Sequence, residues 1–138
     1  KYRLRSSERV RKSAIEYKNA SPIYSLGDYA ELSRDHISKF MLLMEDMDKQ
    51  GVRVAFFLAP YHPIVFDKIT KDYPKVLDSE QFIIDYAKEK SYPVIGSFNP
   101  EQTQTEDALF YDGMHLREAG VRKMIKSSPS IQQWLKKE

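Results

Sequence analysis

The stretch Val52-Arg-Val-Ala-Phe-Phe-Leu-Ala59 is a near-continuous apolar run that stops abruptly at Pro60-Tyr-His-Pro63. Apolar runs of this kind, rich in Val and Phe, are typical of strands that are buried on both faces, as in parallel sheets. Gly51 stands directly before the run, where a left-handed glycine commonly ends a helix. The sequence therefore predicts a buried parallel strand over residues 52–59, with the residues that follow lying at its carboxyl end.

A second strand is predicted over Tyr92-Pro-Val-Ile-Gly-Ser-Phe98, and a helical pattern over about residues 64–90 connects the two strands. This helical region is expected to be interrupted near Tyr73-Pro74, and Ser79 is expected to cap its second part. Strand, helix and strand in this order form a βαβ unit with a right-handed crossover. The predicted class is therefore α/β with parallel strands. Because only two strands are clear, we expect the sheet to be incomplete in this chain.

Further helices are predicted on both sides of this unit. Before it, one helix covers residues 6–18, a brief extended piece follows at residues 23–26, and a longer helix runs over about 29–49 with Asp28 as its N-cap. After it, two helices are predicted, the first over about 116–126. The longer helix carries an apolar stripe that is expected to enter the core: Leu32, Ile37, Phe40, Met41, Met44 and Met47.

The length of 138 residues fits one domain, so residues 1–138 are predicted to form a single α/β domain in which residues 1–28 are a basic N-terminal arm and helix. The absence of cysteine excludes disulfides, thiolate metal sites and cysteine nucleophiles. No apolar run approaches the roughly 20 residues of a membrane span. Because the first residue is Lys1 rather than Met, we expect a longer product, and membrane association only through sequence outside this chain.

The formal net charge of +2 is unevenly distributed. Residues 1–18 contain seven Lys or Arg and two Glu, and residues 117–138 contain six Lys or Arg and two Glu. A basic segment of this kind can attract phosphate groups, but it also describes an ordinary solvated helix face. Nucleic-acid binding usually shows a stronger basic stripe with interleaved aromatic residues, so no nucleic-acid partner is predicted.

Two loops are expected where ligands bind in open α/β sheets, at the carboxyl ends of the strands. The first is Pro60-Tyr-His-Pro63, and the second ends with Phe110-Tyr-Asp-Gly-Met-His-Leu116. A turn can bring Asp112 to His115, so that the carboxylate accepts a hydrogen bond from one ring nitrogen and leaves the other free as a general base. Gly113 between them permits an unusual turn.

The block Phe-Tyr-Asp-Gly-Met-His-Leu116, followed by Arg-Glu-Ala-Gly120, resembles the last motif block of the SGNH (GDSL-type) hydrolase superfamily. The order of elements over about residues 30–126 is also similar to the C-terminal half of that superfamily. The chain is particularly similar to SGNH-like domains of cell-envelope proteins that handle O-acyl groups on polysaccharides or teichoic acids. The resemblance implies a three-layer αβα, flavodoxin-like architecture and a cell-envelope location.

The same resemblance implies a Ser–His–Asp esterase or O-acyltransferase acting on ester-linked acyl groups, without a cofactor. Asp112 would orient His115, and His115 would be the base. The family nucleophile lies in a Gly-Asp-Ser block, which this chain lacks; its nearest string is Gly27-Asp28-Tyr29. The Gly-x-Asn-Asp block of the family is also missing, and Gly96-Ser-Phe-Asn99 resembles it only remotely. We therefore expect the nucleophile upstream of this chain, and the chain alone to be inactive.

Other interpretations of these residues remain open. His115 can be an ordinary loop histidine, Asp112 can simply cap the following helix, and the two could be metal ligands together with His62, although no metal site is predicted. Tyr61 and His62 are predicted to contact substrate, while His62 can equally be a turn residue that contacts the backbone.

The predicted partner is an acylated small molecule or polysaccharide. If the chain folds alone, a homo-oligomer that covers the exposed sheet is also expected. The alternative function is a catalytically inactive SGNH-like domain that binds a glycan or a protein.

Overall fold

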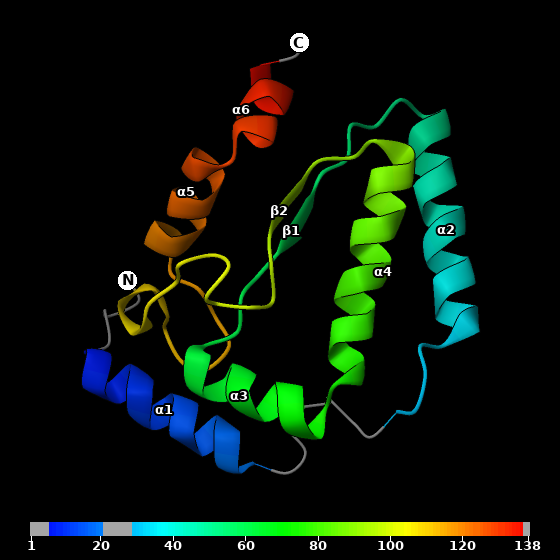
Figure 1. Ribbon diagram of the computed structural model, residues 1–138. Coiled ribbons are helices and arrows are strands. Elements are labelled where there is room, and N and C mark those ends of the chain that lie inside the picture. Colours follow the sequence, from blue (N-terminus) through cyan, green and yellow to red (C-terminus); the bar gives the residue numbers. More distant parts are fainter. Residues whose placement is uncertain (1–5, 21–28, 137–138) are drawn as a thin grey trace.

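A computed structural model describes residues 6–20 and 29–136, which form a mixed α/β fold dominated by helices (Figure 1). The elements in chain order are α1 (Ser7–Asn19), α2 (Arg34–Lys49), β1 (Phe56–Leu58), α3 (Pro63–Asp72), α4 (Lys75–Lys90), β2 (Val94–Gly96), the short 3-10 helix η1 (Asp107–Leu109), α5 (Glu118–Ser127) and α6 (Pro129–Lys136). The predicted α/β class is confirmed. The extended piece predicted at residues 23–26 and the predicted cap Asp28 lie outside the described residues.

The two strands pair in parallel, with Phe56 opposite Val94 and Leu58 opposite Gly96. Helices α3 and α4 connect them, which confirms the predicted strand–helix–strand unit and its interruption at Tyr73-Pro74. Both strands are shorter than predicted because each has a single neighbour among the described residues, and a ladder extends only as far as its partner does. The prediction of burial on both faces is wrong for Phe57, whose exposed fraction is 38%.

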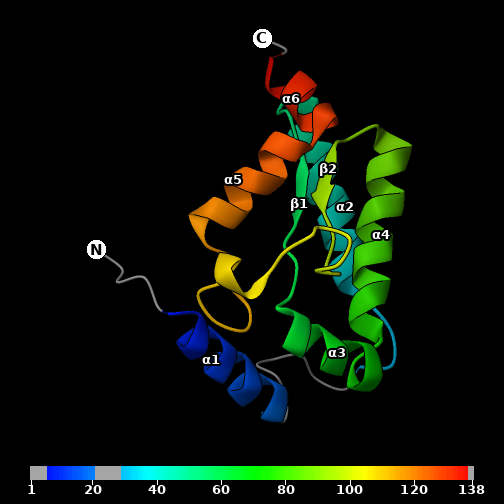
Figure 2. The same cartoon turned by 60° about the vertical axis from the view of Figure 1, so that its left-hand side comes forward.

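Helices lie on both sides of the sheet (Figures 1 and 2). On one side, Phe40 of α2 packs against Phe56 of β1 and Tyr86 of α4, with ring centroids 6.1 and 5.2 Å apart. On the other side, Ile95 of β2 packs in a cluster with Met124 of α5 and Ile131 of α6. Phe56 and Ile95 point to opposite faces of the sheet. Ile95 lies opposite Phe57 in the ladder, and successive side chains along a strand alternate between the two faces.

Helix α2 begins later than predicted, because Ser33 accepts a hydrogen bond from the backbone N–H of His36 and so provides the N-cap. Of the predicted apolar stripe only Met44 is fully buried, and Met41 is exposed, as are Leu42 and Leu43. Gly51 has a φ of 69° and follows the last turn of α2, as predicted.

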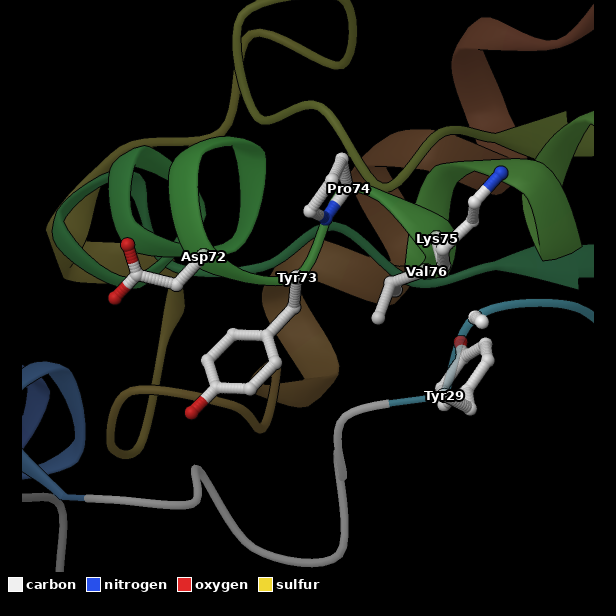
Figure 3. A pocket seen from close by; sticks show the side chains of 7 residues that line it. Tyr29, Asp72, Tyr73, Pro74, Lys75 and Val76 are labelled. Atoms are coloured by element: carbon white, nitrogen blue, oxygen red, sulfur yellow. The ribbon is translucent and has the colours of Figure 1, made fainter.

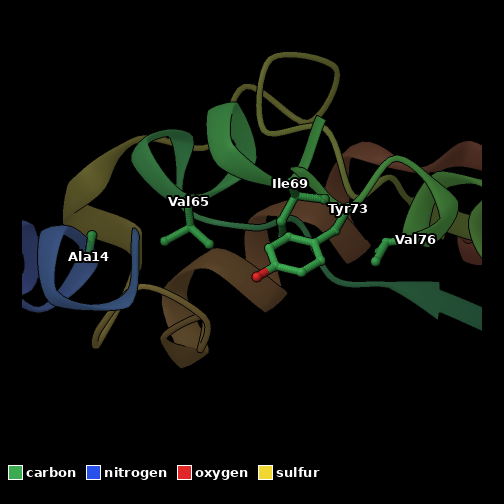
Figure 4. Packing of buried hydrophobic residues seen from close by; sticks show 5 residues of the cluster. All are labelled: Ala14, Val65, Ile69, Tyr73 and Val76. Carbon is green, nitrogen blue, oxygen red and sulfur yellow. The ribbon is translucent and has the colours of Figure 1, made fainter. Parts of the chain in front are cut away.

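A second core lies at the end of the sheet where β1 leads into α3 (Figure 4). Helix α1 lies alongside α3 there, so the helix of the predicted basic arm belongs to the folded unit. The buried residues of this cluster are Ala14, Val65, Ile69, Tyr73 and Val76.

Helix α4 begins at Lys75 rather than at the predicted cap Ser79. The Ser79 hydroxyl instead donates to the carbonyl oxygen of Val76 inside the helix. None of the helices in the described ranges combines the length and the hydrophobicity that crossing a bilayer would need.

Candidate functional site

The segment between η1 and α5 folds into a tight turn that carries Asp112 and His115. The backbone N–H of Tyr111 donates to the carbonyl oxygen of His115 at 2.8 Å, and Phe110 forms an isolated antiparallel bridge with Leu116. Inside the turn, Asp112 Oδ1 accepts hydrogen bonds from the backbone N–H groups of Met114 and His115, at 2.8 and 2.9 Å. A short polar side chain that binds the backbone two and three residues later is a typical turn-former.

The two predicted catalytic side chains meet. Nδ1 of His115 lies 3.0 Å from both carboxylate oxygens of Asp112. Asp112 is mostly buried, with 16% of its side chain exposed, whereas 66% of the His115 side chain is exposed. A carboxylate on Nδ1 holds the proton there, and Nε2 then carries the free lone pair that a general base needs.

Asp112 is held in its charged form. Burial raises the pKa of this carboxyl, but the hydrogen bonds from Met114 N–H, from the His115 ring and from His115 N–H outweigh it, and the net pKa lies below the usual value. At neutral pH the carboxylate is therefore an acceptor for the imidazole N–H.

The two predicted loops are in direct contact. The backbone N–H of His62 donates to the carbonyl oxygen of Gly113 at 3.3 Å, so the Pro60–Pro63 segment touches the turn that carries the dyad. Tyr61 is partly buried, and its ring packs against Phe98 at a centroid distance of 5.5 Å. Burial raises the pKa of the Tyr61 hydroxyl, with Tyr29 and Glu80 adding to the effect, so Tyr61 stays a neutral hydroxyl at physiological pH.

His62 does not occupy the position predicted for a substrate-contacting residue, because its side chain is completely buried. Its Nδ1 accepts a hydrogen bond from the backbone N–H of Ile64 at 3.2 Å and thereby caps α3. Its Nε2 lies 3.2 Å from Asp107 Oδ1 in an orientation that forms no hydrogen bond. The geometry favours the alternative interpretation, in which His62 is a turn residue that contacts the backbone.

The pocket at the corner between α3 and α4 has a volume of about 330 Å³ and is lined by Tyr29, Tyr73, Pro74 and neighbouring residues (Figure 3). A second hollow, of about 420 Å³, lies between α2 and α4 and is lined by Phe40 and Phe82. Asp112 and His115 line neither hollow. His115 instead stands on open surface. In the described part of the chain, no group of three or more metal-ligating side chains gathers in one place.

Two residues beside the site, Asp107 and Arg11, could not be predicted from the sequence. Asp107 faces the His62 ring and also forms an ion pair with Arg11 of α1, at 3.2 Å. Asp107 comes from a polar loop and Arg11 from a basic arm ninety-six positions earlier, so nothing in the local pattern connects them.

The burial of His62 predicts an acid-sensitive fold. Burial lowers the pKa of this imidazole, more than Asp107 and Asp112 raise it, and Arg11 lowers it further. As pH falls, the unfolded chain takes up a proton at about 6.5, whereas folded His62 resists until a lower pH. The unfolded state then binds more protons, so the free energy of unfolding decreases as pH falls below about 6.5.

Urea unfolding between about pH 7.5 and 5 checks this prediction. In a His62→Asn variant the decrease should be shallower, because asparagine keeps the cap without titrating. If the free energy of unfolding decreased equally steeply with falling pH in the two proteins, His62 would not be the cause of the acid sensitivity.

Comparison with known proteins gives no further assignment: no protein-family model, no curated protein and no solved structure matches the chain.

Proposed function

We propose that this chain is the His–Asp part of an SGNH-like esterase or O-acyltransferase that acts on ester-linked acyl groups. In this proposal Asp112 and His115 form the base end of a Ser–His–Asp triad, and the serine comes from sequence outside residues 1–138. The observation that carries the proposal is the contact of His115 Nδ1 with both oxygens of Asp112, on an imidazole that is otherwise exposed.

The proposal includes a three-layer αβα sheet of the flavodoxin-like kind, of which β1 and β2 are one part. Two features support it. Helices lie on both sides of the strands, and Phe57 of β1 is exposed, at 38%. Apolar surface beside a strand edge is where further strands and their helices would add to the sheet.

The turn suits general-base chemistry for a reason of charge. Asp112 is ionised and accepts from Nδ1, so it stabilises the imidazolium that forms when Nε2 takes a proton from a serine hydroxyl. Nε2 then gives this proton to the leaving alkoxide, which departs as an alcohol and leaves the acyl group on the serine. In the second half of the reaction, Nε2 takes a proton from water or an acceptor hydroxyl, whose oxygen attacks the acyl group, and returns the proton to the serine oxygen as the acyl–serine bond breaks. Tyr61, partly buried next to the same turn, is the residue of this chain that we assign to substrate contact.

A second function is favoured by one observation, the open setting of His115 without the Gly-Asp-Ser and Gly-x-Asn-Asp blocks. A domain that never had these blocks would retain the Asp112–His115 turn as structure and would bind a glycan or a protein instead.

A fluorophosphonate probe applied to the full-length gene product separates the two functions. This probe reacts with a serine that a histidine activates. The proposal predicts one labelled serine whose labelling depends on His115. A full-length product that takes up no label would support the binding function.

A further inference from the structure

The side chain of His62 is buried and exposes no atom to the proposed reaction. His62 is nevertheless linked to the Asp112–His115 dyad through a single peptide group. Its backbone N–H donates to the carbonyl oxygen of Gly113 at 3.3 Å. The other end of that same Gly113–Met114 peptide, the Met114 N–H, donates to Asp112 Oδ1 at 2.8 Å. In a planar trans peptide the C=O and N–H groups point in opposite directions. The His62 N–H and the Asp112 carboxylate therefore bind the Gly113–Met114 peptide group at its two opposite edges.

The position of the His62 N–H is itself fixed by the buried ring. Nδ1 caps α3 through Ile64, and the ring lies against Phe110 with centroids 5.1 Å apart. Asp107 faces Nε2 and is bound to Arg11, so helix α1 is tied to the same place. The charged groups that act on the pKa of the ring are Asp107, Arg11 and, on the turn itself, Asp112.

At Gly113 the turn packs closely against α1 and α3. A Cβ added at Gly113 would meet Tyr17 Cδ2 at 2.5 Å, Val65 Cγ2 at 3.0 Å and the backbone of Ala14 at 3.1 Å. Helices α1 and α3 thus lie close to Gly113, beside the peptide that His62 holds.

From this geometry we infer that His62 is a positioning residue for the Asp112–His115 dyad, acting through the Gly113–Met114 peptide. The inference deepens the proposed function, on which its catalytic meaning rests. With the peptide plane fixed, the Asp112 carboxylate stays aimed at Nδ1 and His115 keeps its proton there. If the plane is free to rotate, the carboxylate loses the Met114 hydrogen bond and its hold on the ring loosens.

The test is the protonation of the His115 ring, read from its ¹⁵N chemical shifts in the 138-residue chain at a pH where the ring is neutral. We expect a His62→Asn variant, which retains an N-cap but loses the ring, to shift the His115 Nε2 resonance toward that of a protonated nitrogen. A Ser33→Ala variant removes a comparable cap from α2, far from the turn, and serves as the matched control. It should leave both His115 resonances in place.

An unchanged His115 spectrum in folded His62→Asn would overturn the inference. If that variant does not fold, Asp107→Asn replaces it, because Asp107 is partly exposed and the substitution preserves its shape while removing the charge that pairs with Arg11 and faces the His62 ring. The same shift, smaller in size, is then expected, and its absence counts against the inference. These measurements do not depend on ester cleavage. The positioning role of His62 can therefore be contradicted independently of the result of the fluorophosphonate labelling.

Discussion

Replacement of His115 by alanine in the full-length gene product should abolish serine labelling by a fluorophosphonate and the turnover of ester substrates. Without the imidazole, the serine keeps its proton and is a poor nucleophile. Loss of the base from a triad of this type lowers turnover by a factor on the order of 10⁴ to 10⁶. Asp112→Asn should lower it by roughly 10⁴, because the ring then adopts the wrong tautomer.

A matched control is available on the same chain. His36 is an exposed histidine of α2, and His36→Ala should leave labelling unchanged. If His115→Ala and His36→Ala label equally well, His115 is not the base, and the esterase proposal fails even though the protein carries a reactive serine.

The second large effect concerns Gly96, where β2 ends. Its φ of 85° disfavours any side chain, and an added Cβ would overlap the carbonyl oxygen of Leu58 on β1 and the side chain of Met124 on α5. Gly96→Ala should lower the free energy of unfolding by roughly 3 kcal/mol, about 1 from the positive φ and about 2 from overpacking between strand and helix.

Gly51→Ala is the control for this substitution. Gly51 also has a positive φ, of 69°, but no atom other than those of Gly51 and its chain neighbours lies within 4 Å of an added Cβ. Its replacement should cost only about 1 kcal/mol, from the backbone term alone. Urea unfolding of both variants measures the difference, and a Gly96→Ala variant as stable as Gly51→Ala would show that β1, β2 and α5 do not meet as described.

Local patterns were sufficient to predict the order of helices and strands. The apolar run before Pro60, the cap residues and Gly51 act on their own neighbours, so their effects can be read from the sequence. The expected extent of the first strand was wrong because strand length is set by the partner strand, and only β2 borders it among the described residues. The predicted start of α2 was wrong because Ser33, rather than a residue before it, caps the helix.

The dyad was predictable for a similar reason, since Asp112 and His115 are three residues apart and one turn brings them together. The role of His62 was not. Whether its ring faces substrate or the interior depends on α1 and η1, which are distant in sequence and reach it through Arg11 and Asp107. Other contacts between distant segments, with Ala14 and Tyr17 of α1 and Val65 of α3, explain why Gly113 has no space for a side chain.

The proposed chemistry depends on Asp112, which fixes the proton of His115 on Nδ1 and leaves Nε2 free. The ¹⁵N chemical shifts of the neutral His115 ring measure this directly in the 138-residue chain. We expect a protonated Nδ1 and an unprotonated Nε2, with a shift toward the opposite tautomer in Asp112→Asn, whose amide can donate to Nδ1. A wild-type ring that carries its proton on Nε2, or a spectrum that Asp112→Asn leaves unchanged, would contradict it.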